Sequence, residues 1–325
     1  MTATPTGAST LRGRLRGMDW RSWVVYLGFV GVFAYFAITI PQYFLTPSNL
    51  TNVFIQAAPI AIMAVGAVFV LAAGEIDLSI GSTVALTALV AAVTVQATDI
   101  WWLGAVTGLA TGVLVGLVNG LFVTLVRLPS FLVTLAMMGL VTGVARQLTD
   151  LQSVPVTDAG FVWTFGGGNL LGIPTMIWWT VLITALGWHV LRQRRIGAHV
   201  LAVGNNSSAA RVSGIRVTRV RLWVFMVSGA SAALAALLYT GRLQGAKYTL
   251  GESDLMSVLA AVIVGGTSMN GGKGSIIGAL VGALLMSMIN NGLILAGLNV
   301  SQQMIVRGVI ILVAVALSLR GKKNS

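Results

Sequence analysis

Long apolar runs alternate with short polar segments along almost the whole chain. A helix needs about 20 mainly apolar residues to cross the hydrocarbon core of a bilayer, so each run is a candidate span. The ten runs are 23–40, 53–73, 80–96, 101–126, 131–148, 174–191, 222–241, 255–265, 275–296 and 303–319. The eighth is too short to cross as a regular helix. The pattern predicts an all-α polytopic membrane protein with about ten transmembrane helices and with broken or re-entrant segments near 74–82 and 265–275.

The composition supports burial in lipid and argues against a soluble fold. Of the 325 residues, 56% are hydrophobic and 9% are charged, whereas soluble domains carry about 25% charged residues. A soluble domain of this length could not hide so much apolar surface from water. The sequence contains no cysteine, which excludes disulfides, thiol catalysis and cysteine metal sites.

The basic residues lie where membrane topology puts them. The formal net charge is +12, but the charges stand at the ends of apolar runs and in one mid-chain segment, so nucleic acid is not an expected partner. If the basic tail 1–22 is inside, the basic segment 192–221 and the tail 320–325 are inside too, and 149–173 is outside. Both termini are therefore expected in the cytoplasm, on either side of a single transmembrane domain, 23–319. The first apolar run is longer than a signal-peptide core, so it is expected to be retained.

Glycines recur every four residues in two of the apolar runs. Small residues at this spacing let a second helix approach closely. The two glycine ladders therefore predict tight helix packing rather than a binding site. They consist of Gly104, Gly108, Gly112, Gly116 and Gly120 in the fourth run and Gly274, Gly278 and Gly282 in the ninth.

A polar turn separates the second and third runs. It contains the carboxylates of Glu75 and Asp77 and the hydroxyl of Ser79. Acids so close to the hydrocarbon are costly unless they are paired or hydrated, and they often mark function. A second interpretation is that Asp77 or Ser79 caps the N-terminus of the following helix. Both interpretations stay open from the sequence.

A glycine-rich segment, 265–275, interrupts the apolar pattern near the C-terminal end. It carries the polar side chains of Thr267, Ser268 and Asn270. Non-helical backbone at membrane depth is tolerated only where protein or a water-filled cavity surrounds it, and broken helices line the paths of some transporters. The segment lacks the spacing of a phosphate-binding loop, so no nucleotide site is expected there.

The inside segment contains the pattern of one short helix. Asn206 or Ser207 can cap its start, and Gly214 can end it. A helix of about two turns is marginal alone, so we expect it to dock on a cytoplasmic partner. The alternative is a basic segment that rests on anionic lipid headgroups.

Three segments carry a family resemblance. They are 74–82 (GEIDLSIGS), 204–215 (GNNSSAARVSGI) and 265–293, in which GGTS leads to NNGL at its end. In their order and spacing they resemble the permeases of ATP-binding-cassette importers for ribose, xylose, galactose and related solutes. The resemblance covers nearly the whole chain.

The resemblance implies a membrane subunit without cofactor or enzymatic activity, in the inner membrane of a bacterium. It implies three partners: a cytoplasmic ATP-binding-cassette ATPase, an extracytoplasmic solute-binding protein and a second permease subunit, identical or different. The chain would form the translocation path for a sugar or sugar-like solute. Pentose, hexose, polyol, inositol and a furanosyl signal all remain open.

The resemblance also implies roles for particular residues. It makes 192–221 the coupling segment that contacts the ATPase, through Asn205, Asn206, Ala209, Ala210, Arg211, Gly214 and Arg216. Candidates for the translocation path or its gate are Glu75, Asp77, Ser79, Thr267, Ser268, Asn270, Asn290 and Asn291. The chain departs from its relatives at Glu75, where many have glycine, and at Ser208, where importers often have glutamate.

The outer face offers few basic residues. Arg146, Arg242 and Lys247 are candidates to meet acids on the binding protein, or they anchor the chain at lipid headgroups.

Two other functional classes are alternatives for a polytopic membrane protein. A stand-alone secondary transporter or channel would use Glu75 and Asp77 as its ion or proton site. A membrane-embedded enzyme would need clustered acids, histidines or a nucleophile, and the chain has only eight acids and two histidines.

Overall fold

The computed structural model describes residues 20–299, 301–306, 308–310 and 312, with side chains from Val25 onward. Most of these residues are helical. The helices are α2 (Trp20–Thr39), α3 (Pro41–Phe44), α4 (Pro47–Ala72), α5 (Ile80–Thr98), α6 (Trp101–Thr124), α7 (Ser130–Leu148), α8 (Ala159–Val162), α9 (Thr175–Gln193), α10 (Arg195–Asn205), α11 (Ser207–Val212), α12 (Val217–Leu243), α13 (Asp254–Val264) and α14 (Ile276–Leu295), with a π-helical turn η1 (Trp163–Gly167).

Strands in the described residues form two short antiparallel pairs. β1 (Val154–Pro155) pairs with β4 (Gly245–Ala246), and β2 (Asn169–Leu170) pairs with β3 (Ile173–Pro174). The first pair ties the segment after α7 to the end of α12. The predicted outside loop 149–173 therefore has structure of its own, since it contains β1, α8, η1 and β2.

Nine of the ten predicted apolar runs coincide with helices, namely α2, α4, α5, α6, α7, α9, α12, α13 and α14. The tenth, 303–319, lies mostly outside the described residues, although 301–306, 308–310 and 312 are helical. Among the described residues, six helices are long and apolar enough to cross a membrane: α4, α5, α6, α7, α12 and α14. The all-α polytopic class is confirmed, and the number of about ten crossings stays a prediction.

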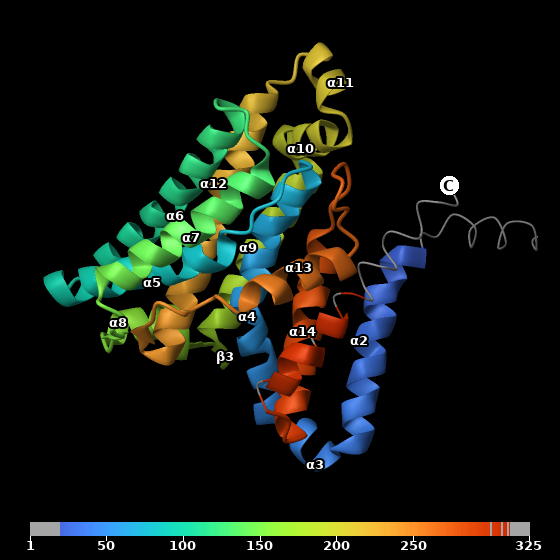
Figure 1. Cartoon of the computed structure of the whole chain (residues 1–325). Helices are drawn as coiled ribbons and strands as arrows, with labels where there is room; N and C mark the ends of the chain where they lie inside the picture. The colour runs from blue at the N-terminus through green and yellow to red at the C-terminus, as the bar shows by residue number, and fades with distance from the viewer. Residues whose placement is uncertain (1–19, 300, 307, 311, 313–325) are drawn as a thin grey trace, which may run out of the picture.

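Helix α12 is the centre of the bundle. It packs most extensively against α6 and also contacts α4 and α5, while α4 contacts α14, α9 and α13 on its other side. In Figure 1, α10 and α11 lie at one end of the molecule, α3 lies at the other end, and α2 runs beside α14. The middle of α12, from Ala232 to Leu238, is buried almost completely. This core holds together the elements that carry the polar turn.

The first glycine ladder packs α6 against α5 and α12. A side chain at Gly108 would meet Ala91 at 3.1 Å, and one at Gly112 would collide with the backbone of Gly229. In the second ladder, side chains at Gly278 and Gly282 would collide with the backbone of α13 and of Gly265 after it. The packing interpretation of both ladders is therefore confirmed.

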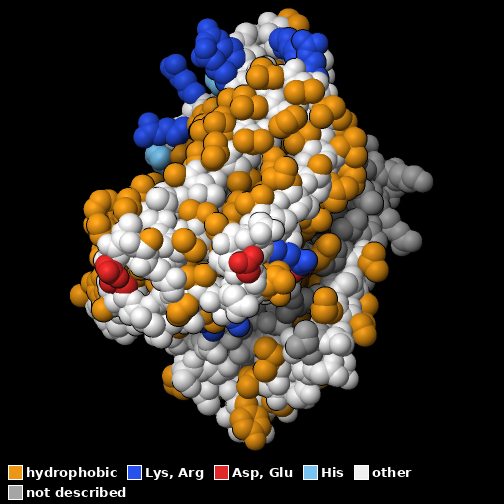
Figure 2. Space-filling view, turned by 60° about the vertical axis from the view of Figure 1, so that its left-hand side comes forward, with side chains coloured by type: hydrophobic (Ala, Val, Ile, Leu, Met, Phe, Trp, Pro, Cys, Tyr) orange, Lys and Arg blue, Asp and Glu red, His pale blue; other side chains and the backbone are white. Residues whose placement is uncertain are grey.

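The outer surface divides into an apolar belt and a basic end. Figure 2 shows hydrophobic side chains over much of the visible face, and Lys and Arg side chains gathered mainly at the end where α10 and α11 lie. Leu132, Leu140 and Val144 of α7 are among the exposed apolar residues. Such a belt is expected of a protein whose solvent is lipid.

The ladder yields a stability prediction. Gly116→Ala places a methyl group against the carbonyl of Phe225 in α12, and we expect it to lower the free energy of unfolding by about 1–3 kcal/mol through overpacking. Gly31→Ala in α2 is the matched control, because a methyl group there meets no atom within 4 Å. Thermal unfolding of the purified chain in detergent measures both. Equal unfolding temperatures for the two variants would contradict the packing.

Candidate functional site

The polar turn between α4 and α5 is a stretch of irregular backbone held inside the bundle. Helix α4 ends at Ala72, and Gly74 adopts φ +79°, a left-handed conformation that glycine accepts without strain. Glu75, Asp77 and Ser79 follow, and all three are buried. Three other helices supply the polar groups that such buried backbone and side chains require.

Asp77 is the most heavily bonded residue of the turn. Its Oδ1 accepts a hydrogen bond from the Ser79 hydroxyl at 2.6 Å and another from the Ser79 backbone N–H at 2.9 Å. Its Oδ2 accepts from the Ser228 hydroxyl of α12 at 2.7 Å. Hydrogen bonds to a buried carboxylate offset the loss of water around it. The side chain therefore links the start of α5 to the middle of α12.

Ser79 extends this network to α6. The Asn119 side chain donates to the Ser79 hydroxyl at 2.8 Å. Asn119 is fully buried, and its Oδ1 has no hydrogen-bond partner. A buried acceptor without a partner is unusual and costs stability. The hydrogen bond from the Asn119 amide to Ser79 is the interaction that offsets this cost.

The capping interpretation is wrong for Ser79. Ser79 occupies the position before the first residue of α5, but its side chain makes no capping hydrogen bond. Asp77 bonds the backbone of Ser79 and a residue of α12 rather than the first turn of α5. Asp77 therefore joins separate parts of the chain.

Helix α7 holds the backbone of the turn between the two acids. The Ser130 hydroxyl accepts from the N–H of Ile76 at 3.1 Å, and the Thr134 hydroxyl donates to its carbonyl at 3.2 Å. The backbone N–H and carbonyl of Ile76 therefore both have hydrogen-bond partners on α7. Ser130 and Thr134 lie on the same face of that helix, because they are four residues apart.

Glu75 forms an ion pair with α12. Its Oε1 lies 2.6 Å from Nε of Arg221, although the N–H bond does not point along this contact. The two side chains differ in burial: 7% of Glu75 is exposed, against 31% of Arg221. Arg221 can therefore be partly hydrated, whereas Glu75 depends on Arg221 for its compensating charge.

The glycine-rich segment 265–275 is non-helical, as predicted, because α13 ends at Val264 and α14 begins at Ile276. Thr267 is buried and accepts from the N–H of Ser275 at 3.2 Å. Ser268 accepts from the N–H of Asn270, which is exposed. Within the part of the chain that the structure describes, no hydrogen bond joins these side chains to Asp77.

This segment meets the inside segment at a contact of bare backbone. The contact is formed by Gly74, Gly204, Gly271 and Gly272 with the end of α4, and we call it the glycine junction. The N–H of Gly272 donates to the carbonyl of Ala72 at 3.0 Å. A side chain at Gly204 would collide with the same carbonyl. The end of α10, the end of α4 and the break between α13 and α14 are therefore in direct contact.

The segment 192–221, predicted to be inside, contains two helices instead of one. The predicted short helix is α11. The Asn206 side chain caps it by accepting from the N–H of Ala209 at 3.0 Å, and Gly214 ends it at φ +82°. The N–H groups of Gly214 and Ile215 donate to the carbonyls of Arg211 and Ala210, which completes a Schellman motif. The preceding helix, α10, was missed, because its apolar residues lie too close to the previous span to stand out.

The two alanines of α11 face opposite ways. Ala210 is buried against the chain itself, whereas Ala209 is exposed. Val212 was not singled out from the sequence, yet 90% of it is exposed. Arg211, Gly214 and Arg216 are exposed as well. The exposed apolar surface of α11 is therefore formed by Ala209 and Val212, and Ala210 packs the helix against the rest of the chain.

The remaining candidates lie apart from the turn. Asn291 forms a reciprocal pair of amide hydrogen bonds with Asn49, at 2.9 and 3.1 Å, which joins α14 to the start of α4. Its neighbour Asn290 is partly buried. The structure thus brings Glu75, Asp77 and Ser79 together and leaves the asparagine pair near the opposite end of α4.

The three outer basic residues differ in availability. Arg242 is half-buried and donates to Asn52 at 3.2 Å. Arg146 lies over the ring of Tyr248, 5.5 Å from its centre. Lys247 is exposed. Across the described residues, no three His, Asp or Glu side chains are close enough to hold a metal ion.

Residues 49–315 match the family described as "Branched-chain amino acid transport system / permease component". The match begins near the start of α4 and includes the polar turn, both inside helices and the glycine-rich segment. No solved structure matches the chain.

Among curated proteins, the ribose import permease protein of Escherichia coli strain K12 is 39% identical over 280 residues, covering 85% of this chain and 87% of the relative. The L-arabinose ABC transporter permease protein of Azospirillum brasilense is 35% identical over 318 residues, covering 97% and 93%. The D-allose transport system permease protein of Escherichia coli strain K12 is 33% identical over 287 residues, covering 88% of each chain.

Because Glu75 is more deeply buried than Arg221, we expect removal of Arg221 to destabilise the fold more than removal of Glu75. Arg221→Gln leaves the carboxylate of Glu75 buried without its partner, and we expect a loss of about 2 kcal/mol in the free energy of unfolding, below the 3–5 kcal/mol typical of fully buried pairs. Glu75→Gln leaves only a partly hydrated arginine and should cost less. Thermal unfolding in detergent measures both.

The double variant Glu75→Gln/Arg221→Gln serves as the control. It removes both charges, so it should unfold at a higher temperature than Arg221→Gln alone. A double variant as unstable as the sum of the single variants would show that the two side chains do not interact.

Proposed function

The chain belongs to this family of transport permeases, and on that premise we propose that it is the membrane-spanning permease subunit of an ATP-binding-cassette importer for a sugar or sugar-like solute. Relatives at 33–39% identity are named as permeases for ribose, L-arabinose and D-allose. The chain is a multi-pass membrane protein and forms part of the solute's path. Hydrolysis of ATP belongs to a separate subunit.

The observation that carries the proposal is helix α11. It is a helix of six residues, capped at both ends, that stands at the basic end of the molecule and leaves Val212 90% exposed. A helix of under two turns is marginal alone, so a capped helix at the surface with Val212 uncovered favours docking on a protein partner. A cytoplasmic ATPase is the partner that an importer permease requires there.

The contacts of the inside segment support transmission of motion into the membrane. Its helix α10 reaches the glycine junction, where it contacts the end of α4 and the break between α13 and α14. A turn of four residues, 213–216, joins α11 to α12, whose Arg221 is paired with Glu75. A displacement of α10 and α11 by the ATPase would therefore act on the irregular segments on both sides of the bundle core.

The outer partner is proposed to be a solute-binding protein, and the membrane is the cytoplasmic membrane of a bacterium. Lys247 is the candidate for charge contacts with that partner, because Arg242 is already bonded to Asn52 and Arg146 lies over Tyr248. A second permease subunit completes the path. No enzymatic role is proposed for this chain.

A stand-alone carrier is less well supported. It needs an acid whose carboxylate is available to an ion or a proton. Asp77 accepts three hydrogen bonds from the chain itself, and Glu75 is paired with Arg221. Both acids therefore serve to hold the turn in the arrangement described.

Substitution of Val212 tests the coupling role. Val212→Asp should abolish co-purification with the partner ATPase and reduce solute-stimulated ATP hydrolysis at least about tenfold, because the proposed apolar contact of the interface is replaced by a charge. The variant should fold normally, since the side chain is 90% exposed. Pull-down and ATPase assays in detergent measure the two effects.

Ala198→Asp is the matched control, because Ala198 is also a small exposed apolar residue but lies near the far end of α10. It should keep wild-type coupling. Ala210→Trp should instead lower thermal stability, because Ala210 is buried within the chain. Wild-type coupling in Val212→Asp would remove α11 as the site of the ATPase.

Cysteine labelling tests the orientation. The chain has no cysteine, and Ser208 in α11 and Ser153 before β1 are both exposed. With an impermeant maleimide, Ser153→Cys should react in intact cells, whereas Ser208→Cys should react only after the membrane is opened. Labelling of Ser208→Cys in intact cells would reverse the proposed topology.

A further inference from the structure

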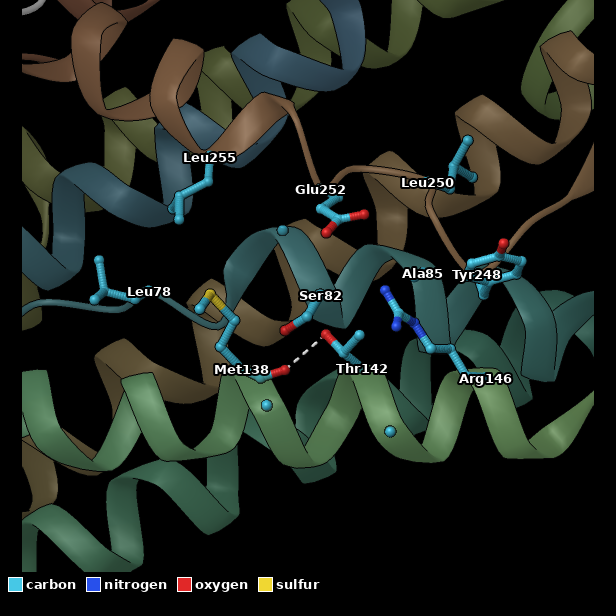
Figure 3. Close-up of a pocket in the computed structure, with 13 residues that line it drawn as sticks. Leu78, Ser82, Ala85, Met138, Thr142, Arg146, Tyr248, Leu250, Glu252 and Leu255 are labelled. Atoms are coloured by element: carbon cyan, nitrogen blue, oxygen red, sulfur yellow. Dashed lines mark hydrogen bonds between the residues drawn. The ribbon is translucent and has the colours of Figure 1, made fainter. Parts of the chain in front are cut away.

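A cavity of about 380 Å³ lies between α5, α7 and the connection from β4 to α13. None of the residues that the sequence proposed for the translocation path lines this cavity. Its floor includes Ser82 and Leu255, which are buried, and its rim includes Arg146 and Glu252, which are exposed. Figure 3 shows these side chains around one space. The volume is in the range of small-molecule sites in proteins.

One wall of the cavity is bare helix backbone. Gly139 and Gly143 of α7 line it, and a side chain built at either would meet no atom within 4 Å. Glycine in a helix costs about 1 kcal/mol relative to alanine. At Gly112 and Gly116 in α6 that cost is offset by close helix contacts, whereas here the missing side chains leave open space.

The polar groups of the cavity include both donors and acceptors. The hydroxyls of Ser82 and Thr142 already donate to the carbonyls of Ser79 and Met138, so they offer lone pairs to the cavity. Arg146 offers a planar set of N–H donors and Glu252 a pair of acceptor oxygens. Neighbouring hydroxyls on a solute match both groups, because each can make two parallel hydrogen bonds.

The charges of the cavity cancel. Arg146 and Glu252 contribute one positive and one negative charge, and these two described residues form no ion pair with each other. An anion or a cation would be attracted by one of these groups and repelled by the other, so the pair gives no net attraction to either charge. Tyr248 also lines the cavity, with Arg146 over one face of its ring, and the rest of this apolar ring can pack against the C–H groups of a solute.

The backbone fixes these groups relative to the polar turn. Gly251 has φ +80°, and its carbonyl approaches α5 so closely that a side chain at Gly81 would lie 2.7 Å from it. Glu252 is thereby positioned over the first turns of α5. Ser82 donates to Ser79, whose hydroxyl and N–H bond Asp77. The cavity floor is therefore part of the same network as Asp77.

We propose that this cavity is a binding site for a neutral polyhydroxylated solute, which the hydroxyls of Ser82 and Thr142, the charges of Arg146 and Glu252 and the ring of Tyr248 recognise together. The inference rests on the proposed function, since it gives the permease a solute site of its own between its outer face and the polar turn. Specificity would then be shared with the binding protein.

Cysteine protection tests the site without any partner protein. Gly143→Cys places a thiol in the cavity, where its Cβ has free space, so the variant should keep the unfolding temperature of the wild type. The alkylation rate by a maleimide is measured in detergent with D-ribose, L-arabinose, D-allose and L-leucine as probes. A sugar at about three times its dissociation constant should slow the reaction about fourfold, because only empty cavities react.

Two further variants complete the design. Ser153→Cys lies on the surface outside the cavity, so its alkylation should not respond to any probe. Adding Glu252→Gln to Gly143→Cys should remove the protection. The inference is overturned if no sugar protects Gly143→Cys, if L-leucine protects it as well as the sugars do, or if protection persists with Glu252→Gln.

The result is independent of the coupling experiment. Protection of the cavity together with normal coupling in Val212→Asp would support the solute site while removing α11 as the ATPase contact. Loss of coupling in Val212→Asp without protection of the cavity would leave the importer assignment standing and remove only the solute site.

Discussion

The arrangement of the bundle depends on the hydrogen bonds that the carboxylate of Asp77 accepts from Ser79 and Ser228. This carboxylate lies among apolar helices, where an acid without partners would be too costly to keep. Its bonds to Ser79 and Ser228 allow the chain to return from α4 to α5 through irregular backbone. Ser130 and Thr134 then satisfy the peptide groups of Ile76. Each helix around the turn is positioned by a polar group that it must supply.

A second constraint is the close approach of backbones. Along α6 the glycines bring α12 near enough for backbone atoms to touch. At the glycine junction, glycines do the same for the end of α4, the end of α10 and the segment between α13 and α14. Contacts without side chains have little freedom to adjust, because there are no rotamers to change. A shift of α10 is therefore passed to the end of α4 and to the segment after α13, instead of being absorbed between them.

Local patterns in the sequence predicted those features that are set by residues close together along the chain. The apolar runs predicted the helices, Asn206 and Gly214 predicted the ends of α11, and the spacing of Gly112 and Gly116 predicted their packing. Contacts across the chain gave no such signal. Ser228 is 151 residues from Asp77, and nothing near it marks it as a partner. The exposed side of α11 was equally hidden, because a pair of adjacent alanines does not say which one faces outward.

Helix α12 connects α11, the polar turn and the β1–β4 pair. It begins just after α11, carries Arg221 and Ser228 to the polar turn, and ends at the β1–β4 pair beside the outer cavity. Its 27 residues form a rod of about 40 Å, given the rise of 1.5 Å per residue. If such a rod tilted about its hydrogen bond from Ser228 to Asp77, it would act as a lever. A tilt of about 5° would move each end by roughly 2 Å, in opposite directions, since each arm is about 20 Å long. Opening at one face would then accompany closing at the other.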